Sequence, residues 1–362
     1  MKKNMLFALF SIILVITLLL FIIQSGGRVE NIETETFISK WMTNDNGTLA
    51  TFLKGDSTQD TDQVQGREAL SESLGLWMQY ALEKDDQDLF EESYLQLQQW
   101  FLEDSGFIYW RLSPIGEAEV TTNALVDDFR IYKVLQLACN RWGDEKYGHT
   151  AEIIGEFLIE HLVSNSYFAD YYDNKSDYLS PVLTLSYVDI EALFLLREEV
   201  GLEHTTFNRM LELLNTMPTK NGFYPMSYHV SENRFEFTKE INLIDQLLVS
   251  LHSQSHKDEL IPFIKKELDH RQAIYGRYNL ETKEPTVSYE SPAVYSLVIM
   301  KAIELEDKEL AKQAYMRMIR FRSSSSKYKG AYSLTNQNTH VFDNLMPLLA
   351  IEKMKTNGWI EK

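Results

Sequence analysis

Acidic side chains stand at the predicted starts of three helices, where carboxylates could be gathered for acid–base chemistry. Glu72 lies near the start of one apolar stripe, Asp127 and Asp128 open a second, and Glu290 precedes a third. An acid at a helix start is by default a surface or capping residue, because the helix dipole favours negative charge there. The pattern alone therefore gives candidates for proton transfer without proving a site.

The motifs of most other enzyme chemistries are missing from the sequence. It holds no G-x-x-x-x-G-K-[ST], G-x-G-x-x-G, H-E-x-x-H or G-x-S-x-G pattern. Among eight histidines only His252 and His256 have the spacing of a helical metal pair, and Cys139 is the single cysteine. We therefore expect no metal and no cofactor. Carboxylates and aromatic rings remain, and glycoside hydrolysis uses one acid to protonate the leaving oxygen and one carboxylate to activate water or attack the sugar.

Aromatic side chains are frequent in the long segments between the predicted helices, where they would be available to stack on sugar rings. These residues are Tyr109, Trp110, Tyr167, Tyr171, Tyr172, Tyr224, Tyr228 and Tyr275. The alternative is that they anchor the loops on the protein core.

The composition excludes several classes of protein. The chain has 362 residues, and its 35 Lys and Arg against 53 Asp and Glu give a net charge of −18. Nucleic acid is excluded as a partner, because neutralising phosphates requires clustered cations. The 44% hydrophobic content excludes a disordered chain. The same acidity disfavours polyanionic glycans and fits a neutral or amino-bearing polysaccharide.

The first 27 residues form a separate segment. Lys2 and Lys3 precede an apolar run over residues 5–23, which as a helix spans roughly the 30 Å hydrocarbon core of a bilayer. The positive-inside rule then predicts a cytoplasmic N-terminus and an exported remainder. We expect residues 1–27 to be an uncleaved signal anchor, and the alternative is a cleaved signal peptide. The exported part carries a charge of −20, since the segment holds two lysines and no acid.

Residues 28–362 show helical spacing of apolar side chains almost throughout and predict one domain of about twelve helices. Tight connections such as 83–88 alternate with long ones such as 104–121 and 164–186. Alternating connections predict helical hairpins with long loops gathered at one end, and six hairpins make an (α/α)6 barrel. The alternative is an open array of hairpins, for which the sequence shows no repeating signature.

Taken together, the three acidic segments resemble the family-8 glycoside hydrolases, which include endoglucanases, chitosanases, xylanases and periplasmic cellulases of cellulose-secreting bacteria. Ser71, Glu72 and Met78 match the family pattern S-E-G-x-x-Y-G-M, while Ser73 replaces its first glycine and Leu-Trp replaces Tyr-Gly. The resemblance implies that Glu72 is the general acid of an inverting enzyme on an (α/α)6 barrel.

A second family pattern, T-D-x-D-L followed by a helix that ends near W-G-D, is placed by the Trp-Gly-Asp at 142–144. In that register Asp128 lies on the second aspartate, which in the family holds the sugar at the cleavage subsite. The first aspartate falls on Val126, a departure from the family. Asp127, next to Asp128, is expected to bind substrate.

The third pattern is Y-D-A-x-R-V, whose aspartate is the catalytic base in the main subfamily. Tyr289 and Glu290 lie on its first two positions, and Ala293 replaces its arginine. The resemblance implies that Glu290 is the base and that Tyr289 binds substrate beside it. It also implies that Tyr187, in a segment similar to the family's P-S-Y, lines the cleft, and that Trp110 forms a sugar platform.

The sequence thus predicts a membrane-anchored, extracytoplasmic glycoside hydrolase that cleaves a β-linked polysaccharide with inversion. Exopolysaccharide production is the expected setting, and its synthesis machinery is a candidate partner. The altered base pattern keeps one alternative open, a catalytically silent polysaccharide-binding protein of the same fold. Another alternative is a different barrel enzyme, such as an unsaturated-uronyl hydrolase, which the acidity of the chain disfavours.

Overall fold

The computed structural model describes residues 31–55, 64, 66–253 and 259–360. The predicted anchor, residues 1–27, lies outside these ranges. Within them, no helix combines the length and the apolar character that crossing a bilayer requires.

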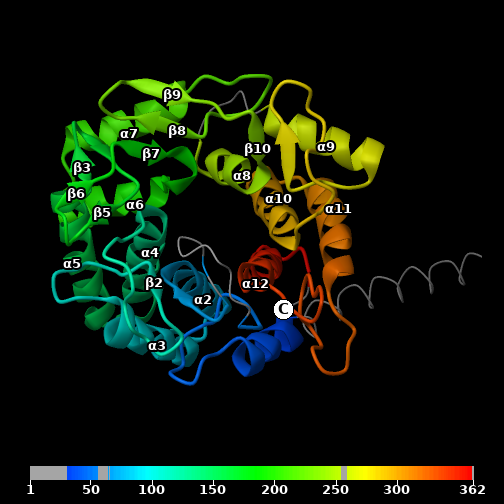
Figure 1. The fold of residues 1–362 in the computed structure, drawn as a ribbon, viewed down its shortest axis with the longest axis horizontal. Helices are drawn as coiled ribbons and strands as arrows, with labels where there is room; N and C mark the ends of the chain where they lie inside the picture. The colour runs from blue at the N-terminus through cyan, green and yellow to red at the C-terminus, as the bar shows by residue number, and fades with distance from the viewer. Residues whose placement is uncertain (1–30, 56–63, 65, 254–258, 361–362) are drawn as a thin grey trace, which may run out of the picture.

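Six helices of the described residues form an inner ring around a central axis (Figure 1). They are α2 (Ser71–Lys84), α4 (Leu125–Trp142), α6 (Ile190–Leu195), α8 (Leu243–His252), α10 (Pro292–Glu304) and α12 (Phe342–Thr356). α2 packs on α4 and α12, and α10 packs on α8 and α12. The 3-10 turn Leu185–Tyr187, which leads into α6, packs on both α4 and α8. These contacts close the ring.

An outer layer of helices alternates with the inner ring along the chain. It consists of a helical stretch at residues 31–41, α3 (Gln87–Gln96), α5 (Glu145–His161), α7 (His204–Thr216), α9 (Leu260–Arg271) and α11 (Lys308–Met318). Each of α3, α5, α7, α9 and α11 packs on the inner helix that precedes it. The π-helical turns Leu97–Phe101 and Leu196–Val200 continue α3 and α6. The prediction of a mostly helical, barrel-like fold is confirmed.

The two layers differ in how their helices are buried. In α10 nearly every residue from Pro292 to Ala302 is buried, and its sequence is apolar around most of its circumference. In α7 burial is confined to one stripe that includes Phe207, Met210 and Leu214. A helix that is apolar all round belongs inside a protein, whereas a single stripe belongs to a surface helix. For α10 and α7 the sequence pattern therefore agrees with the layer that each helix occupies.

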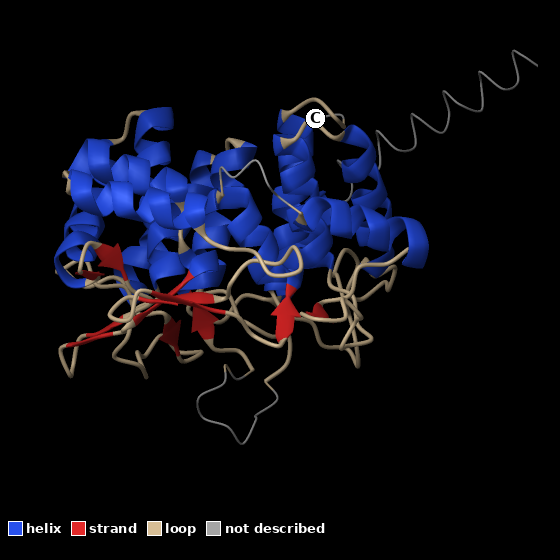
Figure 2. Cartoon of the chain, turned by 90° about the horizontal axis from the view of Figure 1, so that it is seen from above, coloured by secondary structure: helices blue, strands red, loops and turns tan. Residues whose placement is uncertain are grey.

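Short antiparallel strands occupy the long connections, and they gather at one end of the ring (Figure 2). They are β1 (Ala69–Leu70), β2 (Arg111–Leu112), β3 (Val163–Ser164), β4 (Tyr167–Phe168), β5 (Tyr172–Asp173), β6 (Tyr178–Leu179), β7 (Val182–Thr184), β8 (Ser227–His229), β9 (Arg234–Glu236), β10 (Glu240–Asn242) and β11 (Arg277–Asn279). The sequence analysis predicted long loops here and no strands, because two or three residues are too few to show an alternating pattern. The prediction that the long connections share one end agrees with the structure.

Strand pairing fixes how the long connections enter the inner helices. β1 pairs with β2 in the register Ala69↔Leu112, and α2 begins directly after β1. β10 pairs with β11 in the register Ile241↔Tyr278, and α8 begins directly after β10. The inner helices therefore begin at the strand end of the ring. Acids in their first turns are brought to this end, although they are far apart in sequence.

Candidate active site

A cavity of about 800 Å³ opens along the axis of the inner ring. Its polar and aromatic lining includes Glu72, Asp127, Asp189 and Asp245, the cations Arg130 and Lys133, and the rings of Trp110, Tyr187 and Phe342. Four of the sequence-predicted residues therefore share one cavity, namely Glu72, Asp127, Trp110 and Tyr187. These residues come from four separate segments of the chain, which only the closed ring brings together.

Glu72 is the second residue of α2 and projects into this cavity. Burial raises the pKa of its carboxyl to about 7, reinforced by the negative charge of Asp127 and opposed by Arg130. Among the described residues, none donates a hydrogen bond to the Glu72 carboxyl. With a pKa of about 7, about half of the Glu72 carboxyls carry a proton at neutral pH and most do in mildly acidic solution, which is the state required of a general acid.

Asp127 is fixed in place next to Glu72. Its Oδ2 accepts a hydrogen bond from the Ser71 hydroxyl at 3.0 Å, and its Oδ1 pairs with the Arg130 guanidinium at 2.7 Å. Burial raises the pKa of the Asp127 carboxyl, while Arg130 and Ser71 oppose that shift. The Asp127 carboxyl is therefore fixed at the cavity wall, where its negative charge helps to raise the pKa of Glu72.

Asp128 faces the other way. Its side chain is 1% exposed, and its Oδ2 accepts a hydrogen bond from Asn123 Nδ2 at 2.6 Å. Asn123 in turn accepts one from the backbone N–H of Tyr172, so this pair holds the β5 segment against α4. Burial raises the pKa of Asp128 well above its usual value. The structure thus places Asp127 at the cavity, and Asp128 packs behind it.

Asp245 is a residue that the sequence analysis did not single out. It lies in the first turn of α8, lines the cavity, and accepts a hydrogen bond from the Ser186 hydroxyl at 3.1 Å. Burial raises the pKa of its carboxyl, and the Ser186 hydrogen bond opposes the shift. The signal that could have found it is the one used for Glu72, an acid at the start of an inner helix that follows a long connection.

Tyr187 shows that these acids surround a common space. Its pKa is raised, first by burial and then by the charges of Asp170, Asp127, Asp245 and Glu72. Acids from the starts of α2, α4 and α8 thus lie within electrostatic reach of one phenol. A half-buried phenol in that position can hydrogen-bond a sugar hydroxyl, as can the carboxylates around it.

Glu290 lies in a different environment. Its two carboxyl oxygens pair with Arg317 of α11, from Nε at 2.7 Å and from Nη2 at 2.5 Å, and the Tyr295 hydroxyl also donates to it. Burial acts to raise the pKa of Glu290, but these hydrogen bonds outweigh it and the net shift is downward. The predicted motif lacks an arginine at position 293, and Arg317 supplies a guanidinium from the outer layer instead. Glu290 therefore links the start of α10 to α11, apart from the residues that line the cavity.

Tyr289, predicted to bind substrate beside Glu290, is 52% exposed. Its ring covers the backbone at Gly276, where a Cβ atom would stand 2.4 Å from the ring. The side chain serves as a cover for this turn and does not line the cavity with Glu72 in the described structure.

We expect Glu290→Gln to lower stability while leaving the cavity intact. The substitution removes a bidentate charge-assisted pair that is partly exposed, which costs about 1–3 kcal/mol. Thermal unfolding monitored by circular dichroism would report a lower Tm. Arg317→Gln should give a similar decrease, and the double variant should lose less than the sum because both changes break the same pair. Additive losses would contradict this account.

A second cluster of charged residues in the cavity wall consists of Lys133, Asp189 and His252. The Lys133 ammonium bonds the Asp189 carboxylate, and His252 Nδ1 lies 3.7 Å from the same carboxylate. Burial acts to raise the pKa of Asp189, but Lys133 and His252 outweigh it and the pKa is lowered. Burial also lowers the pKa of His252. In the described ranges, no group of three or more His, Cys, Asp or Glu residues is placed to hold a metal ion.

The chain is similar to several known proteins. A Bacillus subtilis protein named "Putative lipoprotein YdaJ" is 37% identical over 333 residues, covering 90% of this chain and 88% of that protein. A solved structure described as a novel alpha-amylase from Clostridium perfringens shares 24% identity with a TM-score of 0.81, covering 90% of this chain and 97% of that one. Endoglucanase Cel10 from Klebsiella pneumoniae, a family 8 glycosyl hydrolase, shares 16% identity with a TM-score of 0.63, covering 90% and 99%.

The family model for glycosyl hydrolases family 8 matches residues 8–166. The match includes Glu72 and Asp127, whereas Asp245 and Glu290 lie beyond it. Since the described structure also has the fold of a family 8 endoglucanase, the chain belongs to the glycosyl hydrolases family 8.

Proposed function

We propose that the protein is an extracytoplasmic, membrane-attached glycoside hydrolase that cleaves a neutral or amino-bearing polysaccharide with inversion. The observation that carries the proposal is the Glu72 carboxyl, which faces the axial cavity with a pKa raised to about 7. An acid in this state gives little to the stability of a fold, because ionising it in a buried site is unfavourable. Its presence is explained by proton donation.

Two carboxyl groups would share the reaction. Protonated Glu72 donates its proton to the glycosidic oxygen as the bond from the sugar carbon to that oxygen breaks. Ionised Asp245 takes a proton from a water molecule, whose oxygen attacks the same carbon from the opposite face and inverts it. Inversion requires about 6.5–9.5 Å between the two carboxyls, which leaves room for the water. We propose Asp245 as the base in place of Glu290, because Arg317 and Tyr295 already occupy the Glu290 carboxylate.

The remaining cavity residues would position the substrate. Asp127, held by Ser71 and Arg130, has a fixed orientation and would accept hydrogen bonds from sugar hydroxyls at the cleavage point. Tyr187 would bond the sugar between the acids, and Trp110 offers an indole face at the cavity edge. The Trp110 ring already has Arg111 at 5.0 Å from its centroid, which helps to fix its orientation.

The cavity favours a neutral or cationic glycan, since an anionic one would meet the carboxylates of Asp127 and Asp245. The endoglucanase relative supports a β-linked glucan. The alpha-amylase relative supports a second candidate, hydrolysis of an α-linked glucan by the same pair of carboxyls. The two candidates differ in the linkage and share the acid, so a single substrate comparison separates them.

Attachment to the outer face of a membrane is the second part of the proposal. The apolar run at residues 5–23 supports it, as does the name of the Bacillus subtilis relative, which describes a lipoprotein. The only cysteine of this chain, Cys139, lies within α4, so we assign attachment to the apolar run. Exopolysaccharide secreted by the producing cell is then the substrate within reach, and its synthesis machinery a candidate partner.

Release of reducing ends from a panel of polysaccharides tests the hydrolase proposal. The panel would contain β-1,4-glucan, mixed-linkage β-glucan, chitosan, amylose and the exopolysaccharide of the producing cells. We expect release from at least one of them and inverted anomeric configuration of the first product by NMR. Binding without release across the panel would instead identify a silent polysaccharide-binding protein, and retained configuration would contradict the mechanism.

A further inference from the structure

The inner helices end at the side of the ring that lies opposite the strands, and the described chain begins at this side. α2 and α12 both end there, and Figure 2 shows the helices extending to this side, away from the strands. We call this side the closed end. Glu72 is at the start of α2 and Lys84 at its end, so the Glu72 backbone lies about 18 Å from this end at 1.5 Å per residue. The cavity continues along the axis as far as Glu83 and Lys353.

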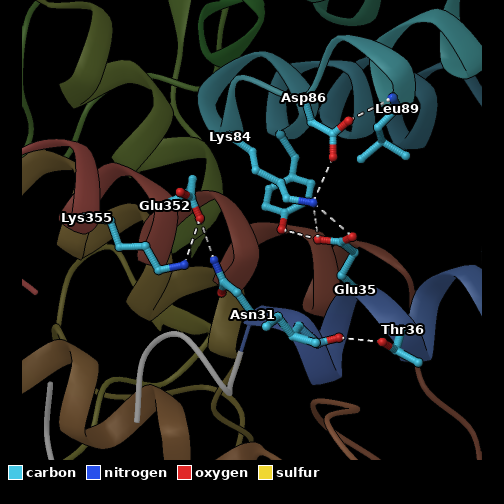
Figure 3. A network of polar contacts seen from close by, with 10 residues as sticks. Asn31, Glu35, Thr36, Lys84, Asp86, Leu89, Glu352 and Lys355 are labelled. Carbon is cyan, nitrogen blue, oxygen red and sulfur yellow. Dashed lines mark hydrogen bonds and ion pairs between the residues drawn. The ribbon is translucent and has the colours of Figure 1, made fainter. Parts of the chain in front are cut away.

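The first described residues are fastened to the closed end. Asn31 Nδ2 donates to Glu352 Oε2 at 2.8 Å, and Lys355 pairs with the same carboxylate at 3.0 Å (Figure 3). Both partners lie in the last turns of α12. Asn31 is 3% exposed, so the chain is held from this residue onward.

A second set of contacts fixes the following turn. Glu35 pairs with Lys84 at 3.0 Å and accepts a hydrogen bond from the Tyr80 hydroxyl at 2.6 Å, both on the last turns of α2 (Figure 3). Lys84 also pairs with Asp86 at 2.9 Å. The helical stretch at residues 31–41 is thereby clamped to two inner helices at the closed end.

The chain between the apolar run and Asn31 is short. It comprises residues 24–30, which fully extended reach at most about 25 Å at 3.3–3.6 Å per residue. A reversed domain would place Asn31 at least the length of α2, about 21 Å, from the bilayer. The connection would then have to run almost fully extended along the outside of the ring. Side chains at the closed end also suit an interfacial position, since Ile32 is 58% exposed and Leu305, which follows α10, is 49% exposed.

We propose that the closed end faces the lipid headgroups and that the strand end, with the candidate active site, faces away from the membrane. This orientation rests on the proposed attachment through residues 5–23. It gives the cavity access to polysaccharide in the surroundings of the cell, and it leaves the end of the inner ring that carries Lys84 and Lys355 next to the bilayer.

Fluorescence quenching on vesicles tests the orientation with the full chain. In a Cys139→Ser background, a fluorophore is attached at Thr356→Cys on the closed end or at Glu119→Cys on the strand end, both exposed positions. The protein is inserted into phosphatidylcholine vesicles that contain a headgroup-nitroxide lipid. With the headgroup nitroxide, we expect several-fold stronger quenching at position 356 than at position 119. With a water-soluble nitroxide, position 119 should be quenched at least as strongly as position 356.

Two results would overturn the proposal. Equal or stronger headgroup quenching at position 119 would show that the strand end faces the membrane. Failure of the full chain to float with vesicles in a density gradient would remove the attachment on which the orientation rests. Neither result bears on hydrolysis, which the polysaccharide panel measures separately.

Discussion

Glu72→Gln is expected to lower kcat by about 10²–10⁴-fold, the usual contribution of a general acid. The amide has nearly the same shape as the acid but has no proton to donate to the leaving oxygen. The measurement is the rate of reducing-end release on the most active polysaccharide of the panel. Glu152→Gln is the matched control, because Glu152 is an exposed glutamate on the outer helix α5 and does not line the cavity. A similar loss in both variants would contradict the assignment.

The dependence on pH gives this prediction a second readout. Because Glu72 must be protonated to act, the wild-type rate should fall as pH rises through about 7, the pKa of its carboxyl. An aryl glycoside with a dinitrophenolate leaving group needs no protonation. Glu72→Gln should therefore cleave it far better than it cleaves the polysaccharide, and this activity should lack the alkaline decline.

The same raised pKa has a consequence for stability. A carboxyl whose pKa is higher in the folded state than in the unfolded state stabilises the fold at low pH, and that contribution is lost as pH rises. For Glu72 the window runs from its ordinary value of 4.5 to about 7. The Tm of Glu72→Gln relative to wild type should therefore increase across this window. An unchanged difference would indicate that the carboxyl is not buried as the structure shows.

Asp245→Asn should cause a comparable decrease in kcat, about 10²–10⁴-fold for the loss of a general base. The cavity keeps its shape, because the amide can still accept a hydrogen bond from Ser186. The assay is again polysaccharide cleavage, with thermal unfolding to show that the variant is folded. Azide, which attacks without losing a proton, should restore turnover of the activated aryl glycoside to Asp245→Asn.

Glu290→Gln is the decisive control for this prediction, since the sequence pattern assigned the base to Glu290. We expect it to retain most of the wild-type kcat at a temperature below its lowered Tm. Full activity in Asp245→Asn together with inactivity in folded Glu290→Gln would restore the original assignment. The two variants thus decide between the base predicted by sequence resemblance and the base indicated by the cavity.

The sequence alone was sufficient to predict the helical architecture and to name Glu72 as the candidate general acid. Apolar stripes of helical period predict the helices, because burial of one face is a local property of each segment. Glu72 could be named because its neighbours Ser71 and Met78 carry the family pattern. The short strands escaped prediction, since pairs such as Ala69 with Leu112 depend on partners far along the chain.

Only the tertiary structure decided which acids meet. Asp127 and Asp128 are adjacent in sequence, but neighbours on a helix point about 100° apart, so one faces the cavity and the other packs against Asn123. Glu290 and Asp245 both stand at starts of inner helices, and no local signal separates them. Arg317, 27 residues after Glu290 in the sequence, binds the Glu290 carboxylate. Ring closure instead brings Asp245 near Tyr187 and Glu72. A side chain's role depends on charges and packing from distant segments, and these exist only once the ring has closed.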